Sequence, residues 1–198
     1  MKKILCVFLL LTEMAIGQEK KTIWSKFVNI TEFGVLPGRV RYNTDTWSAT
    51  PINFEVRTRL SPTIQMFNGF QIKPKTAVGL TVGIDGYNNT VLMPFALGLR
   101  QTLLKKPDKK AEILGSLDVG YGTTLLQLDN STKLTRGGLM ANPMVGYRIP
   151  NRGGSAWLIN FGYKHQQATV DKNITQEEFN SQEKRYYNRF VFRFGFQF

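Results

Sequence analysis

The sequence has little of what metal sites, disulfides and helical anchors are built from. Its 198 residues include one cysteine and one histidine, which excludes an intrachain disulfide and any site that needs two histidines. No apolar run reaches the roughly 20 residues that a membrane-spanning helix requires. We therefore expect no metal, no cofactor and no helical anchor.

Residues 1–17 have the three parts of a cleavable signal peptide. Lys2 and Lys3 form a basic start, Ile4 to Leu11 form an apolar run, and Ala15-Ile16-Gly17 supplies the small residues of a cleavage site. This layout predicts that the protein leaves the cytoplasm.

One domain follows this segment. We expect a periplasmic N-terminal extension at residues 18–25 and a single domain at residues 26–198. Cleavage would also remove Cys6, so the mature chain would have no thiol. The net charge would fall only from +12 to +11, because Lys2, Lys3 and Glu13 are lost. An exported protein rarely meets nucleic acid, so we expect anionic lipid headgroups rather than nucleic acid as partners.

Apolar and polar residues alternate repeatedly from Lys26 to Phe198, whereas helical spacing is absent from longer stretches. The clearest case is the end of the chain, where five phenylalanines share one face: Phe190, Phe192, Phe194, Phe196 and Phe198. Similar alternation predicts strands near residues 52–72, 77–85, 91–101, 111–121, 138–149 and 157–164, and a first, poorly alternating strand near 27–36. These make eight strands.

An even number of strands places both ends of the barrel chain on one side, which is the periplasm for an exported barrel. The connections then sort by length. Short turns are expected at residues 73–75, 105–110 and 150–154, a brief outer loop at 86–90, and long outer loops at 37–51, 122–136 and 166–183. Ten strands is the alternative, because a further turn could lie at Ser61-Pro62 or within residues 123–139.

A soluble barrel also alternates, so the direction of the apolar face needs a separate argument. The polar face is rich in glycine, at positions 79, 83, 98, 120, 146, 162 and 195. Glycine suits a narrow lumen better than a solvated surface. With the predicted signal peptide, this favours an all-β fold: a closed antiparallel up-and-down transmembrane β-barrel with its apolar face toward lipid.

Two segments carry a resemblance to a known family. The alternating strand Arg189–Phe198, with its terminal phenylalanine, resembles the C-terminal strand of bacterial outer-membrane proteins. The segments Asn68–Pro74 and Val78–Tyr87 resemble the second-to-third strand hairpin of small outer-membrane β-barrel domain proteins. The resemblance implies a location in the outer membrane of a diderm bacterium and assembly by the barrel-assembly machinery, which is thought to recognise that strand. It implies no catalytic residue.

The predicted lumen collects most of the charged residues of the strands. These are Glu55, Arg57, Arg59, Arg100, Asp118, Arg148, Lys164, Arg189 and Arg193. An eight-stranded barrel has room for side chains and little else, so we expect ion pairs that fill the lumen. The excess of arginine leaves a small anion-leaning, porin-like pore as an alternative.

His165 is the one residue that suggests catalysis. Lipid A deacylases, which are small barrels, use a histidine with a serine two positions later, but here that position is Gln167. An acyltransferase-like site would have to recruit Asp129, Ser131 or Asp171, and their spacing does not require it. We expect a hydrogen-bonding interfacial histidine, with a lipid-modifying enzyme as the alternative.

The remaining surface predicts contacts rather than chemistry. Aromatic residues near strand ends fit interfacial girdles. The lysines at 105, 106, 109 and 110 predict a solvated turn or a contact for lipid phosphate. The expected protein is thus a monomeric, non-enzymatic barrel in contact with outer-membrane lipids, structural or binding in role, whose outer loops carry any specificity.

Overall fold

The computed structural model describes most of the chain after the predicted signal peptide. The described residues are 26–43, 54–87, 90–105, 111–127, 133–151, 153–172 and 181–198. The predicted signal peptide and N-terminal extension lie outside them. In the described part, no helix is both long and apolar enough to cross a membrane.

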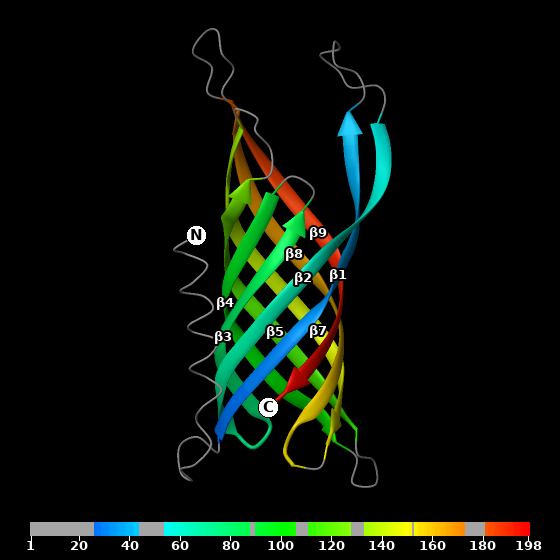
Figure 1. The fold of residues 1–198 in the computed structure, drawn as a ribbon, viewed down its shortest axis with the longest axis vertical. Coiled ribbons are helices and arrows are strands. Elements are labelled where there is room, and N and C mark those ends of the chain that lie inside the picture. Colours follow the sequence, from blue (N-terminus) through cyan, green and yellow to red (C-terminus); the bar gives the residue numbers. More distant parts are fainter. Residues whose placement is uncertain are drawn as a thin grey trace.

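The described strands form one antiparallel sheet that closes on itself (Figure 1). They are β1 (Phe27–Asn43), β2 (Phe54–Lys73), β3 (Thr76–Tyr87), β4 (Thr90–Lys105), β5 (Glu112–Gln127), β6 (Lys133–Arg136), β7 (Gly138–Pro150), β8 (Ala156–Lys172) and β9 (Ser181–Gln197). Closure occurs because β1 pairs with both β2 and β9. Both β6 and β7 pair with β8, and only Gly137 separates them, so they form one strand of the wall. The predicted closed eight-stranded barrel is confirmed.

The chain enters and leaves the barrel at the end that carries the turns after β2, β4 and β7 (Figure 1). The connections at this end after β2 and β7 agree with the short turns predicted at 73–75 and 150–154. Apart from Lys105, the connection predicted at 105–110 lies outside the described residues. We call this end the periplasmic end and the opposite one the outer end.

The strands extend further toward the outer end than predicted. β1 runs to Asn43 rather than ending near Leu36, and its pairing with β2 continues to Asn43 opposite Phe54. β5 and β8 likewise continue to Gln127 and Lys172. The predicted bounds of the three long loops, 37–51, 122–136 and 166–183, are therefore wrong. Backbone pairing satisfies the amides and continues where the apolar alternation fades.

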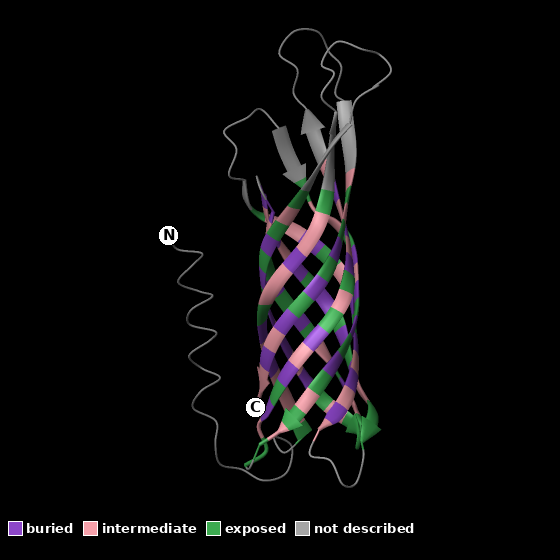
Figure 2. Ribbon diagram, turned by 90° about the vertical axis from the view of Figure 1, so that its right-hand side faces the viewer, coloured by how far each residue is buried: buried purple, intermediate pink, exposed green. Residues whose placement is uncertain are grey.

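The two faces of the wall differ as the sequence predicts, and burial alternates along each strand (Figure 2). In β4, for example, Phe95 and Leu97 are 45% and 69% exposed, whereas Ala96 is 5% exposed. Large apolar side chains cover the outside, while the inside holds polar, charged and small residues. The ladder satisfies the backbone, so this exterior suits hydrocarbon rather than water.

Glycines on the inner face leave space for side chains from the opposite wall. A Cβ placed on Gly98 would lie 2.7 Å from Thr81 Oγ1, 2.8 Å from Asp118 Oδ1 and 2.8 Å from Phe67 Cδ2. Any larger residue at this position would displace the fully buried ring of Phe67 or the carboxylate of Asp118. The glycine-rich face is thus a packing requirement of the narrow lumen.

The last strand closes the barrel through both backbone and aromatic contacts. The amide of Phe198 donates to the carbonyl of Asn29 at 3.0 Å, next to the ladder between β1 and β9. On the outside, Phe194 lies between Phe33 of β1 and Trp157 of β8, with ring centroids 5.6 and 5.2 Å apart. Aromatic packing therefore extends across the closing seam.

Candidate functional site: the charged lumen

The inner face of the barrel brings together most of the predicted lumen residues. Six of them have described, buried or half-buried side chains that come from five strands, and Arg148 is a seventh at the periplasmic end. The six are Arg59, Arg100, Asp118, Lys164, Arg189 and Arg193. Glu55 and Arg57 belong to β2, but their side chains lie outside the described residues.

Glu112 joins two cations at the periplasmic end. Its carboxylate lies 2.9 Å from Lys105 Nζ and 2.6 Å from Arg148 Nη1. Arg148 Nε also donates to Gln197 Oε1 at 2.8 Å, which connects β7 with the last strand. The sequence-based prediction missed Glu112, although this residue lies on the same face as the predicted Asp118.

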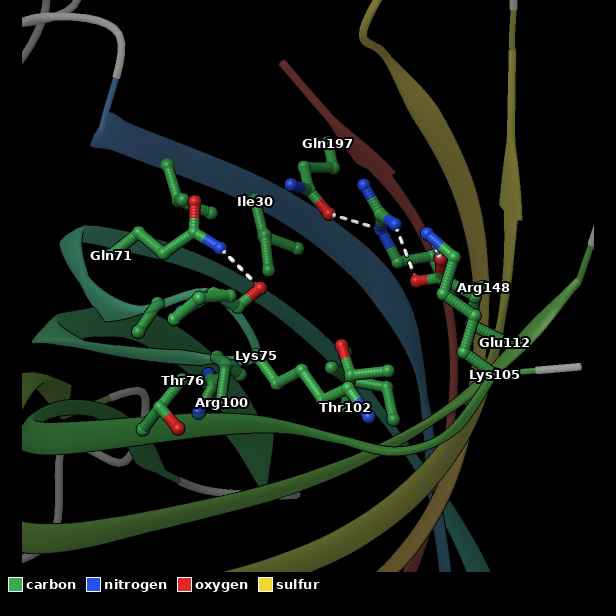
Figure 3. Close-up of a pocket in the computed structure, with 14 residues that line it drawn as sticks. Ile30, Gln71, Lys75, Thr76, Arg100, Thr102, Lys105, Glu112, Arg148 and Gln197 are labelled. Atoms are coloured by element: carbon green, nitrogen blue, oxygen red, sulfur yellow. Dashed lines mark hydrogen bonds and ion pairs between the residues drawn. The ribbon is translucent and has the colours of Figure 1, made fainter. Parts of the chain in front are cut away.

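A cavity of about 170 Å³ lies beside this cluster (Figure 3). Gln71, Lys75 and Thr76 line one side of it, near the β2–β3 turn, and Glu112 and Arg148 line another. Its side chains bond one another rather than converging on the space: Gln71 donates to the Pro74 carbonyl, and Arg148 is held by its two partners. The cavity is a polar vestibule at the mouth of the barrel.

Arg100 and Asp118 form the next layer inward. Their ion pair measures 2.8 Å, and the side chains are 4% and 0% exposed. Thr81 donates to Asp118 at 2.6 Å, and the guanidinium of Arg100 lies 4.4 Å from the ring centroid of Phe67. Phe67 in turn belongs to an apolar cluster that fills the lumen here, with Ile30, Ala77, Leu114 and Leu158.

Glu32 occupies the middle of the lumen and has no described cationic partner. Its carboxylate accepts from Gln65 Nε2 at 2.5 Å and from Asn160 Nδ2. The prediction missed Glu32 because the first strand alternates poorly. Successive residues of a strand face opposite sides. Phe33 is 57% exposed on the outside, so its large apolar side chain is the signal that would have predicted an inward-facing Glu32.

Lys164 and Asp85 form an ion pair one step further out, and each side chain is 1% exposed. Thr63 donates to Asp85 at 2.7 Å. Arg193 completes the layer by donating to Thr63 Oγ1 at 3.0 Å and to Met144 Sδ at 3.4 Å. The predicted charge network missed Asp85, although this residue lies on the same face of its strand as the predicted inward glycines Gly79 and Gly83.

Arg189 lies further toward the outer end of β9 than Val191 and Arg193. It is 4% exposed and crosses Gly38 of β1, where a Cβ would lie 2.4 Å from both Cδ and Nη1 of the arginine. Gly38 pairs with Arg59 of β2. An apolar cluster of Leu36, Tyr87, Leu92, Met144 and Val191 lies at this side of the lumen, and Tyr187 stacks on Tyr87 at 4.5 Å.

His165 belongs to the outward-facing set of β8. Its Nδ1 lies 2.6 Å from Asn188 Oδ1, its Nε2 lies 3.5 Å from Gln167 Nε2, and its ring stacks on Tyr186 at 5.9 Å. Among the described residues, neither a serine hydroxyl nor a carboxylate contacts it. Asp129 and Ser131 lie outside the described residues, as does the side chain of Asp171. In the described part of the chain, no three metal-ligating side chains cluster.

A closed barrel of eight antiparallel strands with an apolar exterior and a polar interior defines the outer-membrane class of transmembrane barrel. The predicted location in the outer membrane of a diderm bacterium agrees with this architecture.

Comparison with known proteins supports the fold. No protein-family model matches the sequence, and no match is found among curated proteins. The crystal structure of the outer membrane protein OprG from Pseudomonas aeruginosa is similar, with a TM-score of 0.55 and 12% identity over 87% of this chain and 95% of that one. The solid-state NMR structure of the outer membrane protein AlkL in lipid bilayers has a TM-score of 0.56 and 10% identity, over 92% and 93% of the two chains.

Proposed function

We propose that this protein is a non-enzymatic outer-membrane barrel with a closed lumen, which presents a binding surface on its outer strand ends and loops. The observation that carries the proposal is a series of side-chain contacts inside the lumen between strands that are not neighbours in the sheet. Lys164 of β8 reaches Asp85 of β3, Asn160 of β8 reaches Glu32 of β1, and Arg193 of β9 reaches Thr63 of β2.

These contacts argue against conduction. A hydrated ion passing along the axis would have to separate at least one buried ion pair and move the ring of Phe67, which is 0% exposed. Separating a buried pair without new partners costs about 3–5 kcal/mol. The charged layers therefore act as a brace between opposite walls rather than as the lining of a pore.

The extended outer strand ends support a binding role. The ladder between β1 and β9 ends at Val35 opposite Phe192, whereas β1 and β2 stay paired to Asn43. The β1–β2 ribbon stands clear of β9 at the outer end (Figure 1). Beyond Val35, the described residues of β1 therefore have a backbone edge with no ladder partner on the β9 side. Such an edge is suited to strand addition by a protein partner.

The outside of the barrel supports the expected contacts with lipid and with the assembly machinery. The apolar face supports direct contact with outer-membrane lipids by a monomer, and the Arg189–Phe198 strand supports recognition by the barrel-assembly machinery. Lys105 is 62% exposed beside Glu112 and is available to lipid phosphate at the periplasmic end. Lys106, Lys109 and Lys110 lie outside the described residues.

Planar-bilayer recording of the purified, refolded protein tests the closed lumen. We expect no resolved single-channel openings from the wild-type protein. Asp85→Ala with Lys164→Ala serves as a sensitivity control, since it removes one layer. Stable openings of the wild-type protein would establish the pore instead.

Lipid turnover tests the absence of enzyme activity. Purified protein in outer-membrane lipid is assayed by mass spectrometry for release or transfer of acyl chains, alongside His165→Ala and the matched neighbour variant Gln167→Ala. We expect all three to be equally inactive. Turnover by the wild type that is lost only with His165→Ala would overturn the proposal.

A further inference from the structure

The outer half of the lumen holds an excess of positive charge. In the register of β1 and β2, the level of Glu32 and Gln65 is followed outward by Gly34 and Thr63, and then by Gly38 and Arg59. Beyond Glu32, the described inward-facing side chains include the cations Arg59, Lys164, Arg189 and Arg193. The one described carboxylate among them is Asp85, and it already binds Lys164 and Thr63.

Some of the donors of two buried arginines in this region lack protein partners. Arg189 is 4% exposed, and its Nε and Nη1 have no hydrogen-bond acceptor among the described residues. Arg193 is 0% exposed and uses its two terminal nitrogens on Thr63 and Met144, whereas its Nε has no acceptor there. Neither arginine has a described carboxylate within ion-pair distance.

Tyr87 packs against the same stretch of β9, where it clusters with Val191 and stacks on Tyr187 at 4.5 Å. Its ring is 5% exposed, and its hydroxyl has no hydrogen-bond partner among the described residues. Unpaired donors of β3 and β9 therefore lie in the same part of the lumen.

An arginine side chain carries its positive charge in any protein setting. An uncompensated buried charge costs several kcal/mol, and a neutral hydrogen-bonding molecule supplies no opposite charge. A counter-anion supplies both the charge and the acceptors that the free N–H groups need.

We propose that the outer half of the lumen binds a small inorganic anion, of the size of chloride or phosphate, between Arg189, Arg193 and Tyr87. The periplasmic half needs no counter-anion, because Glu112 pairs with Arg148 and Asp118 pairs with Arg100. The site is separate from the proposed outer binding surface. It neutralises the lumen and stabilises the closed barrel.

Unfolding in the presence of different anions tests this site. The wild-type protein in a zwitterionic detergent is unfolded thermally in sodium gluconate, sodium chloride and sodium phosphate at equal ionic strength. Gluconate serves as the reference anion, because it is bulkier than the chloride or phosphate that the proposed site would hold. We expect chloride, phosphate or both to raise the midpoint saturably, by roughly 3 °C at ten times the dissociation constant.

Two arginine variants separate specific binding from a general salt effect. Arg189→Gln should lose most of the anion-dependent shift, and Arg189→Lys should keep part of it. Arg148→Gln is the matched control: it removes a lumen arginine that has a carboxylate partner, and it should keep the full shift. Equal shifts in wild type and Arg189→Gln, or no shift in the wild type, would overturn the site.

Bromide in crystals of the wild-type protein gives a test that does not depend on how the variants fold. We expect an anomalous scattering peak within hydrogen-bond distance of the Arg189 guanidinium. Peaks confined to the outer surface would contradict the proposal. Bilayer recording remains an independent test of the closed lumen, because a filled anion site and an open pore give different results there.

Discussion

Asp85 of β3 and Lys164 of β8 form an ion pair across the lumen, and each side chain is 1% exposed. Thr63 connects this pair to Arg193, so four strands meet in one layer. The pair shows how charges from two strands far apart in the sheet neutralise each other inside the barrel while lipid contacts the outside.

Asp85→Asn should strongly destabilise the barrel. The change leaves Lys164 buried beside Arg193 without a carboxylate, and we expect a loss of about 3–5 kcal/mol in the free energy of unfolding. Urea unfolding of the refolded protein in detergent, followed by circular dichroism, measures it.

The double variant Asp85→Asn with Lys164→Met should recover much of that loss, because no uncompensated lysine remains. Lys105→Ala is the control, since it breaks the largely exposed partner of Glu112 and should cost less than about 1 kcal/mol. A loss no larger for Asp85→Asn than for Lys105→Ala would show that the buried pair is not a structural brace.

Gly98→Ala should destabilise the barrel through steric conflict alone. The added Cβ would lie 2.8 Å from both Asp118 Oδ1 and Phe67 Cδ2. Overpacking of this kind costs typically about 1–3 kcal/mol, and urea unfolding measures it. Gly115→Ala is the matched control, because the nearest atom to its Cβ is the flexible end of Leu103 at 3.1 Å. Equal effects of the two changes would contradict the tightly packed lumen.

Deletion of Phe198 should impair assembly in cells more than stability in vitro. It removes the amide that donates to Asn29 and the ring that packs on Phe196 at 4.7 Å. The hydrogen bond contributes about 1 kcal/mol, so the refolded protein should remain a barrel, as judged by its heat-modifiable migration on a gel.

The amount of that variant in the outer-membrane fraction should fall severalfold if the terminal phenylalanine is part of the assembly signal. Phe190→Ala removes a lipid-facing phenylalanine from the same strand and serves as the comparison. Normal outer-membrane levels of the deletion variant would contradict the proposal that Phe198 is part of the assembly signal.

The strands and their lipid-facing residues could be predicted because hydrocarbon tolerates few exceptions to the alternation. Phe95, Leu97 and Leu99 all face outward as expected, and Gly98 faces inward. The partners inside the lumen could not be predicted. Which inward residues share a layer depends on the tilt and stagger of the strands. Asp85 and Lys164 are 79 positions apart in the chain, and no local spacing brings them together.

Glu32 shows the second limit. Its strand has Thr31 and Pro37 at outward positions, where other strands have large apolar residues, and Leu36 on the inward face, so its alternation is weak. The closing pairs with β2 and β9 determine its face instead. The outer strand ends were underestimated for a similar reason: beyond the lipid, pairing continues without a requirement for apolar residues.

Accessibility of spin labels along β4 tests the central claim most directly. The chain has one cysteine, Cys6, so single-cysteine variants of residues 18–198 can be labelled cleanly. Labels at Ala96, Leu97 and Leu99 in refolded protein in lipid vesicles are compared by their collisions with oxygen, which enters lipid, and with a water-soluble nickel chelate. We predict that labels at Leu97 and Leu99 collide with oxygen and not with the chelate, and that the label at Ala96 collides poorly with both. Chelate access at Leu97, or oxygen access as high at Ala96 as at Leu97, would contradict a barrel with lipid outside and a packed lumen inside.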